Sequence, residues 1–127
     1  MKPLKISKTR STPEINLDPV NNLIQIMGES YPENAGIFYH EVMNWLTEYF
    51  KDKNRKITVE LKITYLNTSS SKIVTEILEM IQDFHNNNGN IFLNWYYEED
   101  DEDSLDNGEI FLEEHTFPYK LVPFLDE

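Results

Sequence analysis

The residues with the clearest chemical potential are four consecutive hydroxyl side chains, Thr68 to Ser71, which stand between Asn67 and Lys72. They follow an alternating apolar segment and precede a helical pattern, so we expect them where a strand ends and a helix begins. One hydroxyl there would suffice to cap the helix by accepting a backbone N–H. A phosphate at that position would face the positive end of the helix dipole. The stretch therefore predicts either a helix cap or a phosphate acceptor, and composition does not identify the hydroxyl concerned.

Patterns for catalysis or metal binding are missing from the rest of the sequence. The three histidines are scattered without metal-ligand spacing, and the chain has no cysteine, which excludes disulfides, thiol catalysis and zinc–thiolate sites. The 67–72 run lacks the glycines of a phosphate-binding loop. A calcium loop aligned on Gly108 would place Leu105 at its third position, where an oxygen ligand is required. We therefore expect no cofactor, no metal and no enzymatic activity.

Hydrophobic periodicity predicts the elements that must position the hydroxyl stretch. Segments 14–17 and 23–27 flank a turn and predict an opening hairpin, which follows a flexible lead-in over residues 1–11. Helical spacing is found over 38–49 and 73–84, and strand patterns over 57–65 and 90–97. A further helix is expected around 104–114, and a last edge strand at 117–124, because its two prolines suit an edge.

The strand predicted at 57–65 also indicates the architecture, because it alternates strictly between apolar and polar residues. A strand covered on both faces would be apolar throughout, so this sheet is expected to carry helices mainly on one face. Strand–helix–strand steps should join parallel strands, and the opening hairpin makes the central sheet mixed. We predict a two-layer α/β domain that spans residues 12–127 as a single unit.

The charge balance argues against two classes of binding partner. With 11 basic and 23 acidic residues, the formal net charge is −12. That charge argues against binding to nucleic acid, which needs a basic face, and against docking on an anionic membrane. Direct membrane insertion is not expected, because no apolar run approaches the roughly 20 residues that span a bilayer. The basic N-terminus is followed by no apolar segment, so we expect no secretory signal and a cytoplasmic location.

Much of the excess acidity lies in one segment, residues 98–114, which contains ten acidic residues and no lysine or arginine. Such a run is commonly a solvated loop or helix face. It could instead steer a basic partner. An alternative function is therefore a constitutive protein-binding adaptor or inhibitor that uses the acidic 98–114 surface.

Several blocks of the sequence resemble the SiaC family of bacterial regulatory phosphoproteins. They are GESYPENA at 28–35, Phe38-Tyr39, Trp45-Leu46, YLNTSSSK at 65–72, and WYYE at 95–98, which runs into the acidic segment. The blocks have the family's order and cover most of the chain, from about residue 12 to residue 124. The first block and the hydroxyl block together are the most specific part of the resemblance.

The resemblance implies a STAS-like fold, similar to that of anti-sigma-factor antagonists, and a switch that is not itself an enzyme. It implies phosphorylation by a serine/threonine kinase related to anti-sigma factors and removal of the phosphate by a PP2C-type phosphatase. The unmodified form would bind and activate a diguanylate cyclase and so promote cyclic-di-GMP synthesis and biofilm or aggregation. The family acceptor is the threonine of the NTSSSK block, which is Thr68 in this sequence.

Residues around the acceptor are predicted to bind the partner, and each also has a structural interpretation. Asn67 could position Thr68 or form a strand-end turn, and capping of the helix is the favoured role for Ser69 and Ser70. A loop at 29–34 should lie at the same strand ends, where α/β sheets place partners, or should form a corner with Tyr31 buried. An active site in that loop is the weakest alternative, because no base–nucleophile pair is visible. The predicted partner-binding residues are Asn67, Ser69, Ser70, Ser71, Lys72, Tyr31, Pro32, Glu33 and Asn34.

Overall fold

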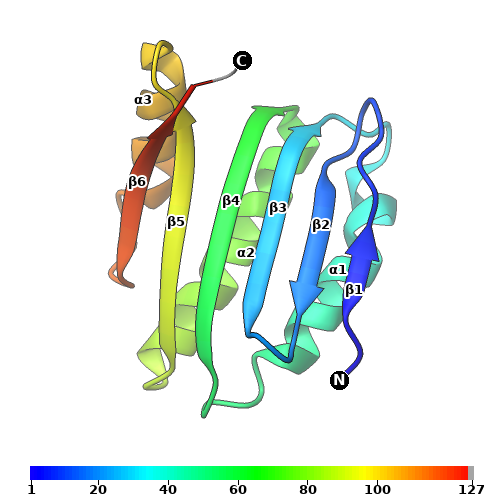
Figure 1. Cartoon of the computed structure of the whole chain (residues 1–127), viewed down its shortest axis with the longest axis vertical. Coiled ribbons are helices and arrows are strands. Elements are labelled where there is room, and N and C mark those ends of the chain that lie inside the picture. The colour runs from blue at the N-terminus through cyan, green and yellow to red at the C-terminus, as the bar shows by residue number, and fades with distance from the viewer. Residues whose placement is uncertain (126–127) are drawn as a thin grey trace.

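The computed structural model describes residues 1–125 as two layers, in which three helices pack against one face of a six-stranded sheet (Figure 1). Strands follow one another across the sheet in chain order. Residues 126 and 127, the end of the predicted domain, lie outside the described residues. The elements are β1 (Leu4–Ile6), β2 (Glu14–Asp18), β3 (Leu23–Ser30), α1 (Ala35–Tyr49), β4 (Lys56–Leu66), α2 (Thr68–Asn86), β5 (Asn90–Glu98), α3 (Glu102–Leu112) and β6 (Tyr119–Phe124).

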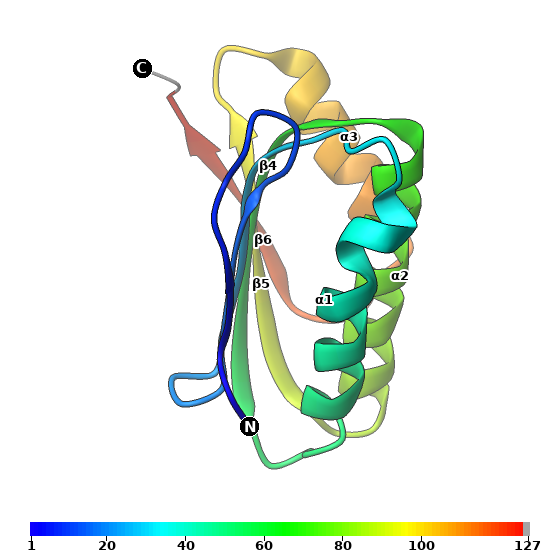
Figure 2. The same cartoon turned by 90° about the vertical axis from the view of Figure 1, so that its right-hand side faces the viewer.

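The sheet is mixed, as predicted. Strands β1, β2 and β3 pair antiparallel, whereas β3, β4, β5 and β6 pair parallel. The three helices that connect the parallel strands all pack on the same face of the sheet (Figure 2). The carboxyl ends of the four parallel strands therefore share one edge of the molecule, the upper edge in Figure 1.

The prediction of a flexible lead-in over residues 1–11 is wrong for much of that segment. Residues 4–6 form β1 and pair with β2 from Leu4↔Leu17 to Ile6↔Ile15. The backbone carbonyl of Lys2 accepts a hydrogen bond from the Trp45 indole at 2.8 Å. Residues 1–11 contain few apolar side chains. Half-burial of Leu4 and Ile6, together with pairing to the edge of β2, is enough to order residues 4–6.

Each long helix buries one apolar row against the sheet. Helix α1 begins at Ala35, directly after the predicted loop, because the Asn34 side chain caps it by accepting the Ile37 N–H at 3.1 Å. Its buried row is centred on Tyr39 and Val42, with Phe38 and Trp45 of the predicted stripe only partly buried. Helix α2 buries Val74, Ile77, Leu78, Ile81 and Phe84. Within residues 1–125, no helix is both long enough and apolar enough to cross a lipid bilayer.

Within residues 1–125, no helix covers the other face of the sheet, and polar side chains join its strands. Asn16 donates to Gln25 Oε1 at 2.9 Å, and Gln25 donates to Glu60 Oε1 at 2.7 Å. Tyr96 donates to Glu60 Oε2 at 3.0 Å. Burial is the main cause that raises the pKa of Tyr96, and the hydrogen bond to the Glu60 carboxylate raises it further. The row crosses four strands, which explains the polar half of the alternation in β4.

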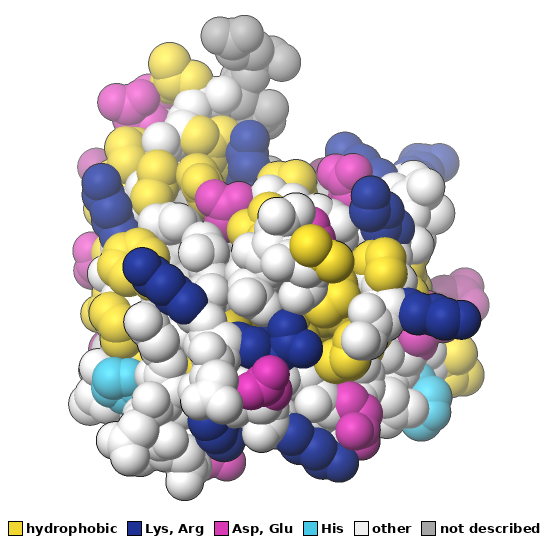
Figure 3. Space-filling model, turned by 60° about the horizontal axis from the view of Figure 1, so that its bottom comes forward, with side chains coloured by type: hydrophobic (Ala, Val, Ile, Leu, Met, Phe, Trp, Pro, Cys, Tyr) yellow, Lys and Arg dark blue, Asp and Glu magenta, His cyan; other side chains and the backbone are white. Residues whose placement is uncertain are grey.

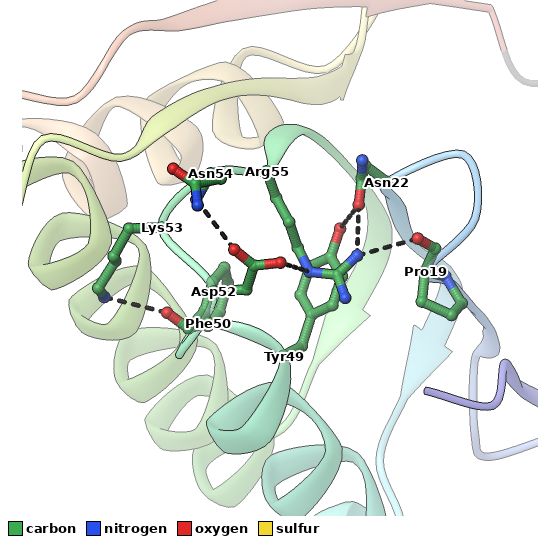
Figure 4. A network of polar contacts seen from close by, with 8 residues as sticks. All are labelled: Pro19, Asn22, Tyr49, Phe50, Asp52, Lys53, Asn54 and Arg55. Atoms are coloured by element: carbon green, nitrogen blue, oxygen red, sulfur yellow. Dashed lines mark hydrogen bonds and ion pairs between the residues drawn. The ribbon is translucent and has the colours of Figure 1, made fainter.

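At the end of the molecule where β4 begins, a polar network ties the β2–β3 turn to helix α1 (Figure 4). The Arg55 guanidinium donates to the Asn22 side chain at 2.9 Å and to the Pro19 carbonyl at 3.0 Å. Tyr49 also donates to Asn22 at 2.9 Å, and the guanidinium lies 4.6 Å from the centre of the Tyr49 ring. Burial raises the pKa of Tyr49 to about 12, against the opposing effect of Arg55. The surface around this end mixes basic and acidic side chains (Figure 3).

We predict that Arg55→Ala lowers the free energy of unfolding by about 1–3 kcal/mol, because it removes two hydrogen bonds and the stacking on Tyr49. Urea unfolding at neutral pH measures the change. Lys51→Ala is the matched control, because this neighbouring side chain is 66% exposed and pairs only with Glu48; its effect should stay within about 0.5 kcal/mol. Equal effects of the two substitutions would contradict a stabilising role for the network.

Candidate functional site

The hydroxyl stretch lies at the carboxyl edge of the sheet, where β4 ends and α2 begins. Asn67 stands between these two elements. Its backbone N–H donates to the Ser30 carbonyl at 3.0 Å, and its side-chain N–H donates to the Pro32 carbonyl at 3.2 Å. The loop that follows β3 is therefore bonded directly to the start of α2. This confirms the prediction that the two segments share the same strand ends.

The cap of α2 is Asn67 and not one of the hydroxyl side chains. Its Oδ1 accepts the backbone N–H of Ser70 at 2.9 Å, and its backbone is extended. The prediction that Ser69 and Ser70 cap the helix is therefore wrong. Asparagine is a strong capping residue, and it stands one position before the first helical residue, Thr68. Of the two roles considered for Asn67, positioning the Thr68 backbone is the one that the geometry supports.

Ser70 belongs to a buried hydroxyl cluster together with Ser30 and Tyr39. Ser30 Oγ donates to Ser70 Oγ at 2.8 Å and lies 2.6 Å from the Tyr39 hydroxyl. Both serine side chains are completely buried, and burial raises the pKa of Tyr39. The cluster joins the end of β3, helix α1 and the first turn of α2. Ser70 thus anchors the helix start, and the prediction that it contacts a partner is corrected because its side chain has no exposed surface.

Thr68 and Ser69 lie on the outer side of the same turn, and both are exposed. No hydrogen bond of the Thr68 hydroxyl is found within residues 1–125. Ser71 is half-buried and donates to the Asn67 carbonyl at 3.1 Å, whereas Lys72 is exposed one turn after Thr68. The first turn of α2 contains no acidic residue. The Thr68 hydroxyl is therefore accessible, and its surroundings favour a negative charge.

The loop from Tyr31 to Asn34 combines structural and exposed residues. Pro32 is buried, which corrects its prediction as a partner contact. Tyr31 is half-buried and packs edge-on against Tyr65 at 5.8 Å between ring centres. Glu33 and Asn34 are exposed, although the Asn34 side chain is engaged as the cap of α1. The loop is a fixed corner that still presents Glu33 and part of Tyr31 beside the hydroxyl stretch.

Tyr65 is a surface residue, although strict alternation over 57–65 would place it on the apolar face with Ile57 and Leu61. It is 55% exposed. The pairing of β3 with β4 changes register between Gly28 and Glu29, so that Gly28 pairs with Ile63 and Glu29 with Tyr65. This irregularity interrupts the alternation of the strand. Gly28 has a φ of +123°, a conformation that L side chains rarely adopt, and it lies inside β3, which continues to Ser30 beyond the predicted segment 23–27.

The acidic segment forms helix α3, which packs beside β5 near the same edge of the sheet (Figure 2). Asp101 caps it by accepting the backbone N–H groups of Asp103 and Ser104 at 3.0 and 3.4 Å. Gly108 is buried, and a Cβ there would lie 2.7 Å from the Trp95 indole nitrogen. Within the described chain, no group of three or more potential ligands is placed to hold a metal ion.

A family model described as SiaC family regulatory phosphoprotein matches residues 6–124. An uncharacterized protein of Pseudomonas aeruginosa (strain UCBPP-PA14) is 32% identical over 121 residues, which cover 95% of this chain and 96% of that protein.

Solved structures give the same likeness. SiaC of P. aeruginosa is 30% identical with a TM-score of 0.88, over 98% of this chain and 100% of that chain. A crystal structure of the diguanylate cyclase SiaD in complex with its activator SiaC, also from P. aeruginosa, matches with 31% identity and a TM-score of 0.91, over 95% of this chain and 99% of that chain.

We predict that Ser70→Ala lowers the free energy of unfolding by about 1–2 kcal/mol, because it leaves the buried Ser30 hydroxyl without its acceptor. Ser69→Ala is the control, since the adjacent serine is exposed and its change should stay within about 0.5 kcal/mol. Chemical denaturation of the two variants and the parent measures the difference. If Ser70→Ala is as stable as Ser69→Ala, the buried hydroxyl cluster does not anchor the helix start.

Proposed function

The chain belongs to the SiaC family of regulatory phosphoproteins, and on that premise we propose that it binds and activates a diguanylate cyclase. The observation that carries the proposal is the complex of P. aeruginosa SiaC with the cyclase SiaD, whose activator matches this fold with a TM-score of 0.91 over 95% of the chain. The protein would act by binding a partner and not by catalysis. In the cell it would work in the cytoplasm, where it would promote cyclic-di-GMP synthesis and biofilm or aggregation.

Reversible phosphorylation of Thr68 is the proposed control of that interaction. Three features support Thr68 as the acceptor: its hydroxyl is exposed, it occupies the first residue of α2, and the Asn67 cap holds its backbone in place. A kinase related to anti-sigma factors would add the phosphate, and a PP2C-type phosphatase would remove it. Ser70 does not compete as an acceptor, because it is buried.

The physical basis of the switch is the desolvation of a phosphate in a protein interface. Unmodified Thr68 can be covered by a partner at little cost. Phosphothreonine carries a charge of about −1.5 to −2, and covering it without dedicated arginines is strongly unfavourable. Lys72 is the neighbouring basic residue on the same helix. A penalty of about 3 kcal/mol would weaken binding more than a hundredfold, with no refolding of the protein.

The surface that would meet the cyclase surrounds Thr68. Its exposed members are Ser69 and Lys72 on α2, and Glu33 on the loop after β3. Tyr31, Asn67 and Ser71 are half-buried beside them, and Asn34 contributes its exposed edge. These residues come from segments that Asn67 joins by hydrogen bonds, so they would form one rigid surface.

We predict that Thr68→Ala binds and activates the cyclase about as well as the unmodified parent, whereas Thr68→Asp binds at least about tenfold more weakly. The reason is that only the second variant introduces a charge into the contact. Titration of the purified cyclase, with synthesis of cyclic-di-GMP as a second readout, measures both effects. Thr47→Ala and Thr47→Asp are matched controls, because this exposed threonine lies in the last turn of α1, away from the surface around Thr68, and both variants should bind as the parent does.

If Thr68→Asp and Thr68→Ala both bind as the parent does, the switch does not lie at Thr68. Binding that salt weakens strongly, with no effect of either Thr68 variant, would favour the adaptor or inhibitor that uses the acidic 98–114 surface. Intact-mass analysis and fragment mapping of protein from its native cell provide an independent check, since the modified form should carry one phosphoryl group on Thr68.

A further inference from the structure

Strands β4 and β5 separate at the carboxyl edge of the sheet. Their pairing runs from Lys56↔Asn90 to Leu61↔Trp95 and ends there. Beyond this point β4 continues to Leu66 and β5 to Glu98, and the two ribbons diverge toward the upper edge in Figure 1. The sheet is therefore divided in its interior, although both stretches remain strands.

Each of the two separated stretches keeps a partner on its outer side only. Residues 62–66 of β4 remain paired with β3, and residues 96–98 of β5 remain paired with β6. In a parallel strand, alternate residues direct their N–H and C=O groups to opposite sides. At the end of β5, however, the Glu98 N–H donates to Ser104 Oγ at 2.9 Å and the Glu98 carbonyl accepts the Asp101 N–H at 3.1 Å. The division thus leaves one free strand edge, that of β4 beyond Leu61. Free edges of this kind are templates for an added strand.

A cavity of about 500 Å³ lies beside the free stretch of β4, between residues 63–66 of that strand, Trp95 of β5 and helix α3. Its apolar lining includes Ile63, Leu66, Trp95 and Phe111, with the Trp95 and Phe111 rings 5.2 Å apart. Helix α3 supplies one wall, since Gly108 allows it to lie directly against Trp95. The cavity combines free backbone groups with apolar surface, and an extended peptide satisfies both.

The charged side chains that line the cavity indicate the charge of the peptide that it would bind. Asp101 and Asp103 line the cavity, and they belong to the acidic segment that ends at residue 114. The described lining contains neither lysine nor arginine. Lys62, the nearest basic residue on β4, extends over the Phe124 ring at 4.3 Å instead. An anionic ligand would be repelled here, whereas a basic one would be attracted.

We propose that this cavity, the β4–β5 cleft, binds an extended basic segment of a partner protein, which adds as a strand along the free edge of β4. Backbone hydrogen bonds would supply binding that tolerates sequence variation, and the acidic wall would select lysine and arginine. The inference assigns a role to the acidic segment that cyclase activation through Thr68 does not use, and it applies to the unphosphorylated chain.

The test uses the full unmodified chain, labelled with ¹⁵N, and a short synthetic peptide that alternates lysine with valine. We expect saturable binding at low salt, with the largest changes in the amide signals of residues 62–66 and in the Trp95 indole signal. An otherwise identical peptide with N-methylated amides should bind much more weakly, because it cannot pair as a strand. A glutamate–valine peptide should not bind.

The acidic wall is tested by the double variant Asp101→Asn and Asp103→Asn, which should weaken binding of the lysine–valine peptide about threefold to tenfold. Asparagine still caps a helix, so α3 should persist. Asp106→Asn with Glu109→Gln removes the same charge from exposed positions of α3 that do not line the cleft. This control should bind nearly as the parent does. Absence of binding, indifference to N-methylation or equal effects of the two double variants would overturn the proposal.

Discussion

Asn67 connects three parts of the chain within one residue. Its backbone N–H bonds to the end of β3, its side-chain N–H bonds to the loop after that strand, and its side-chain oxygen caps α2. All three contacts act within one residue of Thr68. The exposed hydroxyl is thereby held on a backbone that cannot shift without breaking several hydrogen bonds, which is the condition for a modification to act through its charge alone.

The four hydroxyl residues 68–71 look equivalent in the sequence, but the first turn of α2 directs their side chains to different sides. A turn of 3.6 residues directs Thr68 and Ser69 outward, and it directs Ser70 into contact with Ser30 and Tyr39. Ser71 bonds back to Asn67. One short run therefore contains an accessible acceptor and the anchor that keeps it in place, so modification need not disturb the fold.

The pairing of strand β4 with its neighbours changes along its length. This change forms both the surface around Tyr65 and the β4–β5 cleft at the carboxyl edge. Up to Leu61 it is a central strand with partners on both sides. After Leu61 it loses β5, and the change of register against β3 turns Tyr65 to the surface. Tyr65 then packs against Tyr31 of the loop after β3 on one side and lines the β4–β5 cleft on the other. The two surfaces are adjacent because one strand supplies both.

The sequence by itself determined the order of the elements, the mixed one-sided sheet and the family, because periodicity and motif spacing are local properties. It also placed Thr68 at the start of a helix. Only the tertiary structure decided that Asn67 is the cap, that Ser70 and Pro32 are buried, that residues 4–6 join the sheet and that β4 and β5 separate. These outcomes depend on contacts between segments distant in the chain, such as Ser30 with Ser70, and local patterns do not encode such contacts.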